Sequence, residues 1–206
     1  GCDAGKEPIR VVPAVHYFMG GLYVDRFHRT TLKGVYAAGE CACQYHGANR
    51  LGGNSTLGAI YGGRVAAETA VKECESVSLD VFERAAEIEV SDIIDKLSLH
   101  REINREVNAV KKLKRLMTDT MSIIRFEEGL KAGLEELAGF SPRDVYAPKN
   151  SSADALHFEN KLILSRAVIL SALERRESRG SHARSDYPNT SDEFRKTTVA
   201  GYKNGE

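Results

Sequence analysis

A glycine-rich loop that leads directly into a helical segment is the feature that most constrains this chain. The loop spans residues 46–55 and reads HGANRLGGNS, so three glycines surround one permanent cation and two amides. Glycine permits close backbone approach and unusual torsion angles, and the start of a helix presents free N–H groups to an anion. Arg50 adds a planar fork suited to a carboxylate. The loop therefore predicts a backbone packed around a small anionic ligand.

Composition changes near residue 76. Residues 1–75 hold 12 of the 18 glycines but 15 of the 58 charged side chains, and residues 76–206 hold the other 43 charges. A glycine-rich, weakly charged segment is typical of a backbone close to a ligand, and a charge-rich one is typical of solvated helices. We expect an α+β chain, with short strands at residues 9–12, 21–24 and 35–38 and a helix at 55–71.

Residues 76–206 carry apolar side chains at helical spacing. The pattern predicts helices at residues 81–97, 103–124, 126–137 and 156–176, with a loop at 150–153 and a turn at Asp186-Tyr187-Pro188. The chain from Thr197 onward resembles the start of a strand. Apolar stripes of this kind are typical of the core of a helical bundle, which we prefer to a cofactor-binding box.

Charge and cysteine content exclude several classes. With 29 basic and 29 acidic side chains the net charge is zero, which argues against a nucleic-acid surface or an anionic-membrane patch. No apolar run approaches the length of a transmembrane helix, so we expect no direct membrane insertion. Four cysteines are too few for a disulfide framework in a chain of 206 residues. Cys41-Ala42-Cys43 lacks the second half of a zinc motif, so we expect no metal.

Four motifs resemble a known family. They are HYFMGG from residue 16, GVYAAGE from residue 34, the loop at 46–55, and RRESRGSHARSDYP from residue 175. Their order resembles the late motifs of the succinate dehydrogenase/fumarate reductase flavoprotein family, of which L-aspartate oxidase is a close relative. The resemblance implies FAD as cofactor, the C-terminal part of an FAD-binding domain at residues 1–75, and a helical C-terminal flavoprotein domain at 76–206.

The resemblance also implies that the chain is a C-terminal portion of a longer polypeptide. Residue 1 is glycine rather than an initiator methionine, and no G-x-G-x-x-G turn for a dinucleotide pyrophosphate occurs in the sequence. A capping domain with an arginine proton donor, and a histidine that bonds to flavin in some members, would precede these residues. We therefore expect the isolated chain to be catalytically inactive.

Two catalytic side chains are implied by the resemblance. Arg50 would bind a carboxylate of a C4 dicarboxylate bidentately and stabilise charge that develops as hydride moves. The alternative is a structural arginine paired with a nearby carboxylate. His16 would bind a substrate carboxylate beside the flavin, and its alternative is a satisfied core histidine. His46 is interpreted as shaping the loop without touching substrate.

Cofactor contacts are implied at the same loop. Glu40 would accept a hydrogen bond from a flavin ribityl hydroxyl, unless it is a solvent-facing residue at a strand end. Arg50 and the helix start, at Asn54, Ser55, Thr56 and Leu57, would face the isoalloxazine ring. Arg179, His182 and Arg184 resemble an anion site, but the family pattern favours a structural role for them.

The resemblance implies interconversion of succinate and fumarate, with electrons passing to an iron–sulfur partner subunit or a soluble carrier. L-aspartate oxidase is the close alternative, although those enzymes more often show Ala-Ser where this chain has Gly52-Gly53. A non-catalytic helical interaction module is the rival from another class, supported by residues 76–206 alone. We expect a cytoplasmic protein, with any membrane association made through partner subunits.

Overall fold

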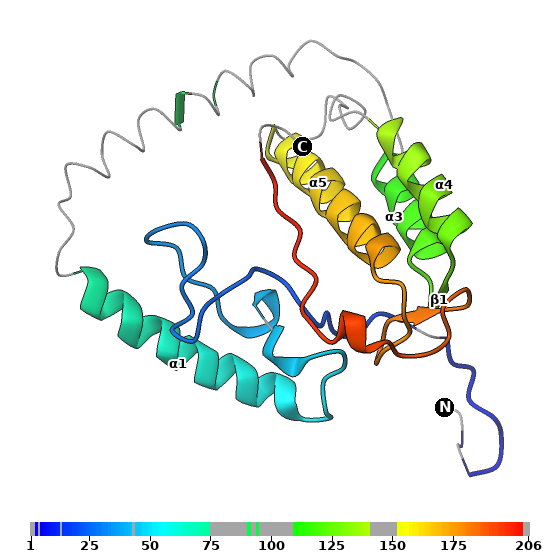
Figure 1. Cartoon of the computed structure of the whole chain (residues 1–206), viewed down its shortest axis with the longest axis horizontal. Coiled ribbons are helices and arrows are strands. Elements are labelled where there is room, and N and C mark those ends of the chain that lie inside the picture. The colour runs from blue at the N-terminus through cyan, green and yellow to red at the C-terminus, as the bar shows by residue number, and fades with distance from the viewer. Residues whose placement is uncertain are drawn as a thin grey trace. The chain divides into compact units, whose positions relative to one another are not determined.

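The computed structural model describes residues 3, 5–12, 14–42, 44–74, 90–91, 94, 109–140 and 152–203. The chain forms two compact units, Gly1–Cys74 and Glu75–Glu206. Figure 1 shows a long helix, α1, in the first unit and the helices α3, α4 and α5 with a short sheet in the second. This combination is the expected α+β class.

The first unit is built from extended segments and turns around α1 (Asn54–Cys74), with two 3-10 turns, η1 (Gly39–Cys41) and η2 (Gln44–His46). The strands expected at residues 9–12, 21–24 and 35–38 are not paired strands. Only the isolated bridges Gly21↔Ala42 and Arg29↔Tyr36 form among the residues described in this unit. A strand needs a continuous ladder of hydrogen bonds with a neighbour, and single bridges do not supply one.

The helix predicted at residues 55–71 is confirmed as α1. Its glycines allow the preceding segment to pack against the helix backbone, as at Gly62, where an added Cβ would lie 2.8 Å from the ring of His28. His28 is buried, has a φ of 63°, and holds its Nδ1 atom 2.8 Å from the carbonyl oxygen of Ala37. Close packing therefore offsets the low helix propensity of glycine.

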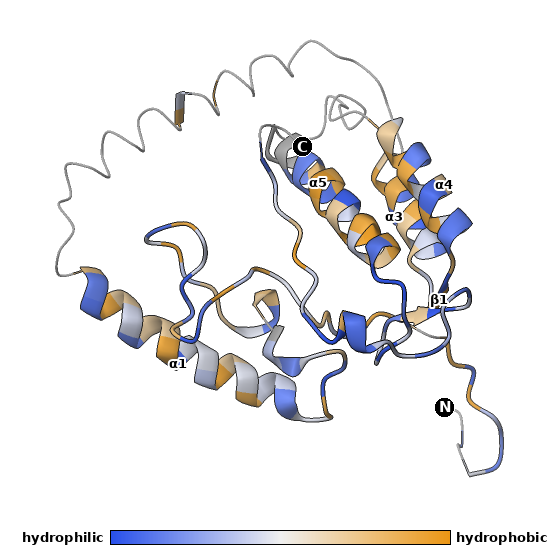
Figure 2. Ribbon diagram, viewed as in Figure 1, coloured by the Kyte–Doolittle hydropathy of each residue, from blue (hydrophilic) through white to orange (hydrophobic). Residues whose placement is uncertain are grey.

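The second unit has a helical core. α3 (Ala109–Thr120), α4 (Glu127–Ala138) and α5 (Ser152–Glu174) contact one another pairwise, and Figure 2 shows hydrophobic residues along all three. Leu130, Phe158 and Ile169 are fully buried, and each such side chain contributes about 1.5–3 kcal/mol relative to exposure. The apolar stripes are therefore bundle core, as predicted.

Two helix boundaries and one predicted strand differ from the sequence prediction in the second unit. α3 ends at Thr120, because Ile124–Arg125 forms strand β1, which pairs in parallel with β2 (Ala183–Arg184). The loop predicted at 150–153 is wrong at residues 152 and 153, which lie in α5. The tail from Thr197 forms no strand within residues 197–203. Most of the predicted helix at 81–97, and residues 103–108 of the next, lie outside the described residues.

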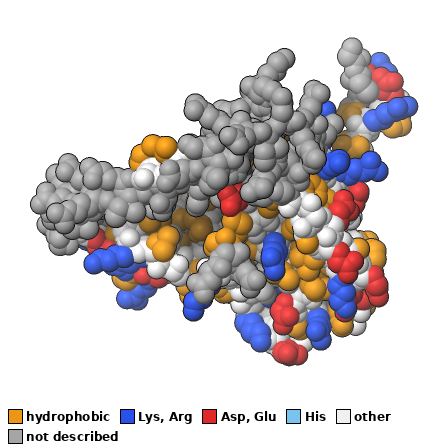
Figure 3. Space-filling model, turned by 90° about the horizontal axis from the view of Figure 1, so that it is seen from above, with side chains coloured by type: hydrophobic (Ala, Val, Ile, Leu, Met, Phe, Trp, Pro, Cys, Tyr) orange, Lys and Arg blue, Asp and Glu red, His pale blue; other side chains and the backbone are white. Residues whose placement is uncertain are grey.

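The surface carries charges of both signs. On the face seen in Figure 3, acidic and basic side chains are interspersed rather than gathered by sign. No described helix is long and apolar enough to span a membrane. Within the same residues, no group of three or more His, Cys, Asp or Glu side chains is placed to hold a metal ion.

Candidate active site

The glycine-rich loop turns sharply twice before α1. Gly47 has a φ of 66° and Gly53 a φ of 81°, values that side-chain-bearing residues rarely adopt. The N–H of Asn54 donates to the carbonyl oxygen of Leu51 at 3.2 Å, which closes the loop onto the helix start. The first N–H groups of a helix have no intrahelical acceptor. The backbone amides of residues 55–57, in the first turn of α1, can therefore donate hydrogen bonds to a ligand.

Arg50 lies on this loop with its guanidinium largely uncommitted. Nη1 donates to the carbonyl oxygen of Leu51 at 3.1 Å, and the guanidinium carbon lies 4.4 Å from the centre of the Tyr17 ring. The buried Nε–H has no hydrogen-bond partner among the described residues, and no ion pair of Arg50 forms within them. The structural alternative, an arginine paired with a nearby carboxylate, is therefore not what this part of the chain shows.

His16 and Arg50 meet at one hollow. The hollow has a volume of about 230 Å³ and is lined by His16, Tyr17, Met19, Asn49 and Arg50. His16 is exposed rather than buried, so it is not the satisfied core histidine that was the alternative to a functional role. The structure thus brings together two side chains that are 34 positions apart in the sequence, by their residue numbers 16 and 50.

Glu40 ties the His16 segment to η1. Its Oε1 atom accepts the backbone N–H of Phe18 at 3.0 Å, and the N–H of Leu22 donates to the carbonyl oxygen of Cys41 at 2.7 Å. Gly21 has a φ of 122°, and a Cβ there would overlap that carbonyl. Glycine is required at this contact. A carboxylate has further lone pairs, so Glu40 retains capacity to accept a ligand hydroxyl.

His46 shapes the loop instead of lining the hollow. Its ring lies edge-on to Tyr45 at 4.8 Å and to Tyr17 at 5.9 Å between centroids. A Cβ added to Gly58 of α1 would come within 3.2 Å of His46 Nε2 and 3.1 Å of the Tyr45 ring. The small residue at position 58 therefore makes room for these two rings, in keeping with the predicted role of His46.

The basic residues of the downstream motif are engaged within their own unit. Arg184 is buried and donates through Nε and Nη2 to both carboxylate oxygens of Asp186 at 2.7 Å, and through Nη1 to the carbonyl oxygen of Ala172 at 2.7 Å. Asp186 also accepts the N–H of Glu127 at 2.8 Å. The pair therefore joins the C-terminal end of α5 to the N-terminal end of α4, where cations and anions respectively are stabilised.

A buried carboxylate, that of Glu177, completes this network. Glu177 accepts both N–H groups of Arg179 at 2.8 and 2.9 Å and the backbone N–H of Ser191 at 2.8 Å. These hydrogen bonds, that of Arg179 first, lower the pKa of Glu177 to about 2, and the Arg184 guanidinium lowers that of Asp186 to about 2. The downstream motif is a structural network, not an anion site.

Sequence reasoning missed Tyr17, Glu177 and Asp186 as organising residues. Tyr17 follows His16 directly, so only its contact with Arg50 distinguishes it from a core aromatic residue. The alternation of charge around Glu177 (Arg175, Glu177, Arg179) could have suggested a buried ion pair.

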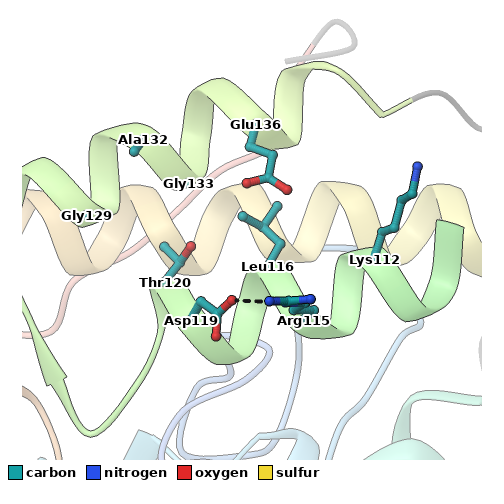
Figure 4. Close-up of a pocket in the computed structure, with 9 residues that line it drawn as sticks. All are labelled: Lys112, Arg115, Leu116, Asp119, Thr120, Gly129, Ala132, Gly133 and Glu136. Atoms are coloured by element: carbon teal, nitrogen blue, oxygen red, sulfur yellow. Dashed lines mark ion pairs between the residues drawn. The ribbon is translucent and has the colours of Figure 1, made fainter.

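Another hollow lies between α3 and α4, with a volume of about 360 Å³ (Figure 4). Charged side chains of both signs line it, and Arg115 and Asp119 on α3 form an exposed pair at 3.7 Å. Gly129, Ala132 and Gly133 of α4 form its small-residue side (Figure 4).

Comparison with known proteins identifies the family of this chain. A model of the FAD binding domain matches residues 1–56, and a model described as fumarate reductase flavoprotein C-term matches residues 110–206. The chain belongs to the succinate dehydrogenase/fumarate reductase flavoprotein family. This is a family of FAD-dependent oxidoreductases, and FAD is its cofactor.

Relatives of several activities match almost the whole chain. The succinate dehydrogenase flavoprotein subunit of Bacillus subtilis is 38% identical over 216 residues, covering 97% of this chain and 37% of that protein. The L-aspartate oxidase of Pyrococcus horikoshii is 34% identical, covering 94% of this chain and 35% of that protein. The chain thus spans little more than a third of the length of these relatives.

Solved structures agree on the fold. A mutant quinol fumarate reductase of E. coli superposes with a TM-score of 0.75 at 29% identity, covering 93% of this chain and 35% of that chain. The Sdh1 complex of Mycobacterium smegmatis superposes with a TM-score of 0.66 at 30% identity, covering 84% and 31%.

Proposed function

We propose that this chain supplies part of the active site of an FAD-dependent enzyme that interconverts succinate and fumarate. The observation that carries the proposal is the shared hollow of His16 and Arg50, where the buried Nε–H of Arg50 has no acceptor among the described residues. A buried donor without an acceptor is costly, and a substrate carboxylate would satisfy it.

The chain's own residues would bind and orient the substrate. Arg50 would grip one carboxylate of a C4 dicarboxylate through two parallel N–H···O bonds, because the guanidinium fork matches carboxylate geometry. His16, exposed on the same hollow, would donate to a carboxylate oxygen. The fixed charge of Arg50 would also stabilise negative charge that develops on that carboxylate as hydride moves.

The residues present fit the cofactor. Glu40 keeps acceptor capacity for a ribityl hydroxyl beside its bond to Phe18, and Asn54, Ser55, Thr56 and Leu57 form the first turn of α1, where the N–H groups favour an anionic ring edge. When bound, FAD supplies hydride acceptance or donation at flavin N5. An iron–sulfur partner subunit or a soluble carrier would exchange electrons with it, and a cytoplasmic setting would suit both arrangements.

L-aspartate oxidase is the second candidate. Identity of 34–35% to two Pyrococcus L-aspartate oxidases favours it, since an amino dicarboxylate would use the same arginine. The B. subtilis succinate dehydrogenase subunit, at 38%, and the Gly52-Gly53 pair favour the succinate and fumarate group. Gly53 adopts a positive φ of 81°, which a serine at that position would adopt only with strain.

The test uses the protein expressed from its complete gene, loaded with FAD. Turnover is measured with succinate, fumarate and aspartate in wild type, Arg50→Lys and His16→Gln, with Arg166→Lys on the exposed face of α5 as the matched control. We expect Arg50→Lys to lower kcat/KM by about 100-fold or more, because an ammonium group cannot form the bidentate contact.

The results separate the possible substrates and test the role of Arg50. Succinate or fumarate turnover that collapses in Arg50→Lys but not in Arg166→Lys supports the proposal. Turnover of aspartate alone moves the assignment to the second candidate. Equal activity of wild type and Arg50→Lys on every substrate would remove Arg50 from the site. The 206-residue chain alone, assayed alongside, is expected to show no turnover.

A further inference from the structure

The aromatic side chain next to Arg50 is that of Tyr17. The Arg50 guanidinium lies over the face of Tyr17, 4.4 Å from the ring centre. A cation over an aromatic face is attracted by the ring quadrupole. A guanidinium carries five N–H donors, and attraction of the cation to a ring requires no carboxylate or carbonyl acceptor, so acceptors can still bind those donors.

Tyr17 also packs against the ring of His46, which in turn packs against the ring of Tyr45. Its ring meets the edge of His46 at 5.9 Å, and His46 meets Tyr45 at 4.8 Å between ring centroids. The hydroxyl of Tyr45 donates to the carbonyl oxygen of Gly58 at 3.3 Å. A row of three rings therefore runs from the α1 backbone to Arg50, and Gly58 leaves the space that its first two members occupy.

We propose that Tyr17 is a positioning residue that holds the guanidinium of Arg50 over its ring and leaves N–H donors, that of Nε among them, for a substrate carboxylate. Holding a long side chain before binding lowers the conformational entropy lost when the ligand arrives. This inference rests on the proposed function, since it concerns the same carboxylate. It adds a residue that acts through Arg50.

The experiment compares Tyr17→Phe, Tyr17→Leu and Tyr17→Met in the FAD-loaded protein expressed from its complete gene. The probe is malonate, a dicarboxylate that cannot be desaturated, and its dissociation constant is read from the change in flavin absorbance. We expect Tyr17→Phe to stay within twofold of wild type, because the ring is retained. The two aliphatic variants should bind malonate about fivefold to tenfold more weakly.

A second measurement does not need bound flavin. Phenylglyoxal modifies exposed guanidinium groups, and peptide mass spectrometry reports its rate at Arg50 alone. We expect Arg50 to react faster in the aliphatic variants than in wild type and Tyr17→Phe. Tyr202→Leu, which changes a tyrosine 59% exposed in the second unit, serves as the matched control and should change neither readout.

The outcomes separate the two proposals. If Arg50→Lys weakens malonate binding but the aliphatic variants bind like wild type, Tyr17 has no positioning role and the proposed function stands. If Arg50→Lys binds malonate normally, the proposed function fails first. Weak binding in Tyr17→Phe equal to that in Tyr17→Leu would also overturn the inference, because a ring would then not suffice.

Discussion

At the scale of single residues, hydrogen bonding determines which ring nitrogen of His182 carries the proton. Nη1 of Arg125 lies 3.1 Å from Nδ1 of His182, and Nε2 of the ring lies 3.1 Å from the carbonyl oxygen of Arg175. Arg125 can only donate, so Nδ1 accepts and the proton sits on Nε2. Burial foremost, and the neighbouring arginine charges, lower the pKa of His182 below 6.5.

We predict that His182 stays neutral, as the Nε2–H tautomer, from pH 7 to below its ordinary pKa. Because the folded-state pKa is lowered, the unfolded chain binds the proton more readily, and this residue lowers the free energy of unfolding as pH falls through 6.5. Nitrogen-15 NMR of the imidazole reads both tautomer and titration, with His182→Gln assigning the signal. A titration at or above pH 6.5 would contradict the assignment.

At the scale of elements, one glycine permits the contact between α3 and α4. A Cβ on Gly133 would lie 2.5 Å from the hydroxyl oxygen of Thr120, which is buried. Figure 4 shows Gly133 on α4 above Thr120 on α3. Helices approach most closely where one of them lacks a side chain, so the spacing of this pair depends on position 133.

We predict that Gly133→Ala destabilises the protein by about 1–3 kcal/mol, because the buried Thr120 cannot move aside. Gly129→Ala on the same helix is the matched control. There the nearest atoms belong to the Phe126 ring, at 2.9 Å, and that residue is 48% exposed and free to turn. Urea unfolding of both variants checks this, and equal losses would show that crowding at Thr120 is not the cause.

At the scale of the whole molecule, ion pairs with one buried member, Arg184 or Glu177, connect segments of the second unit. Arg184 holds the carbonyl end of α5 and, through Asp186, the N–H end of α4. Glu177 binds Arg179 and the backbone at Ser191. Segments far apart in sequence are thereby joined by charge-assisted bonds, which are stronger than neutral ones.

We predict that acid unfolds this unit as Glu177 and Asp186 take up protons. Their folded-state pKa values of about 2 lie below the ordinary 4.5 and 3.8, so the stabilisation is present above pH 4.5 and lost as pH falls toward 2. Glu177→Gln should cost about 1–3 kcal/mol at pH 7, since it removes the buried carboxylate that accepts from the half-buried Arg179. Glu177→Gln should also reduce the fall in unfolding temperature between pH 4.5 and pH 2, measured by thermal unfolding. A fall as steep as that of wild type would refute the assignment.

Much of the fold could be predicted from residues alone. The periodicity of residues 126–137 and 156–176 located α4 and α5 to within a few positions, because an apolar stripe must be buried. The strands at 9–12, 21–24 and 35–38 could not be decided in this way. An extended segment becomes a strand only when a neighbour completes its ladder, and that neighbour is not encoded locally.

By itself the sequence determined the family motifs, the glycine loop and the helical bundle, since local torsion preference and periodicity act over a few neighbouring residues. The tertiary structure alone decided that His16 and Arg50 share one hollow, that Tyr17 lies under the guanidinium, and that Arg184 is bound within its own unit. Side-chain contacts between distant segments depend on how the chain packs. Only the folded chain therefore distinguishes Arg50, whose Nε–H has no partner among the described residues, from Arg184, which is bonded to Ala172 and Asp186.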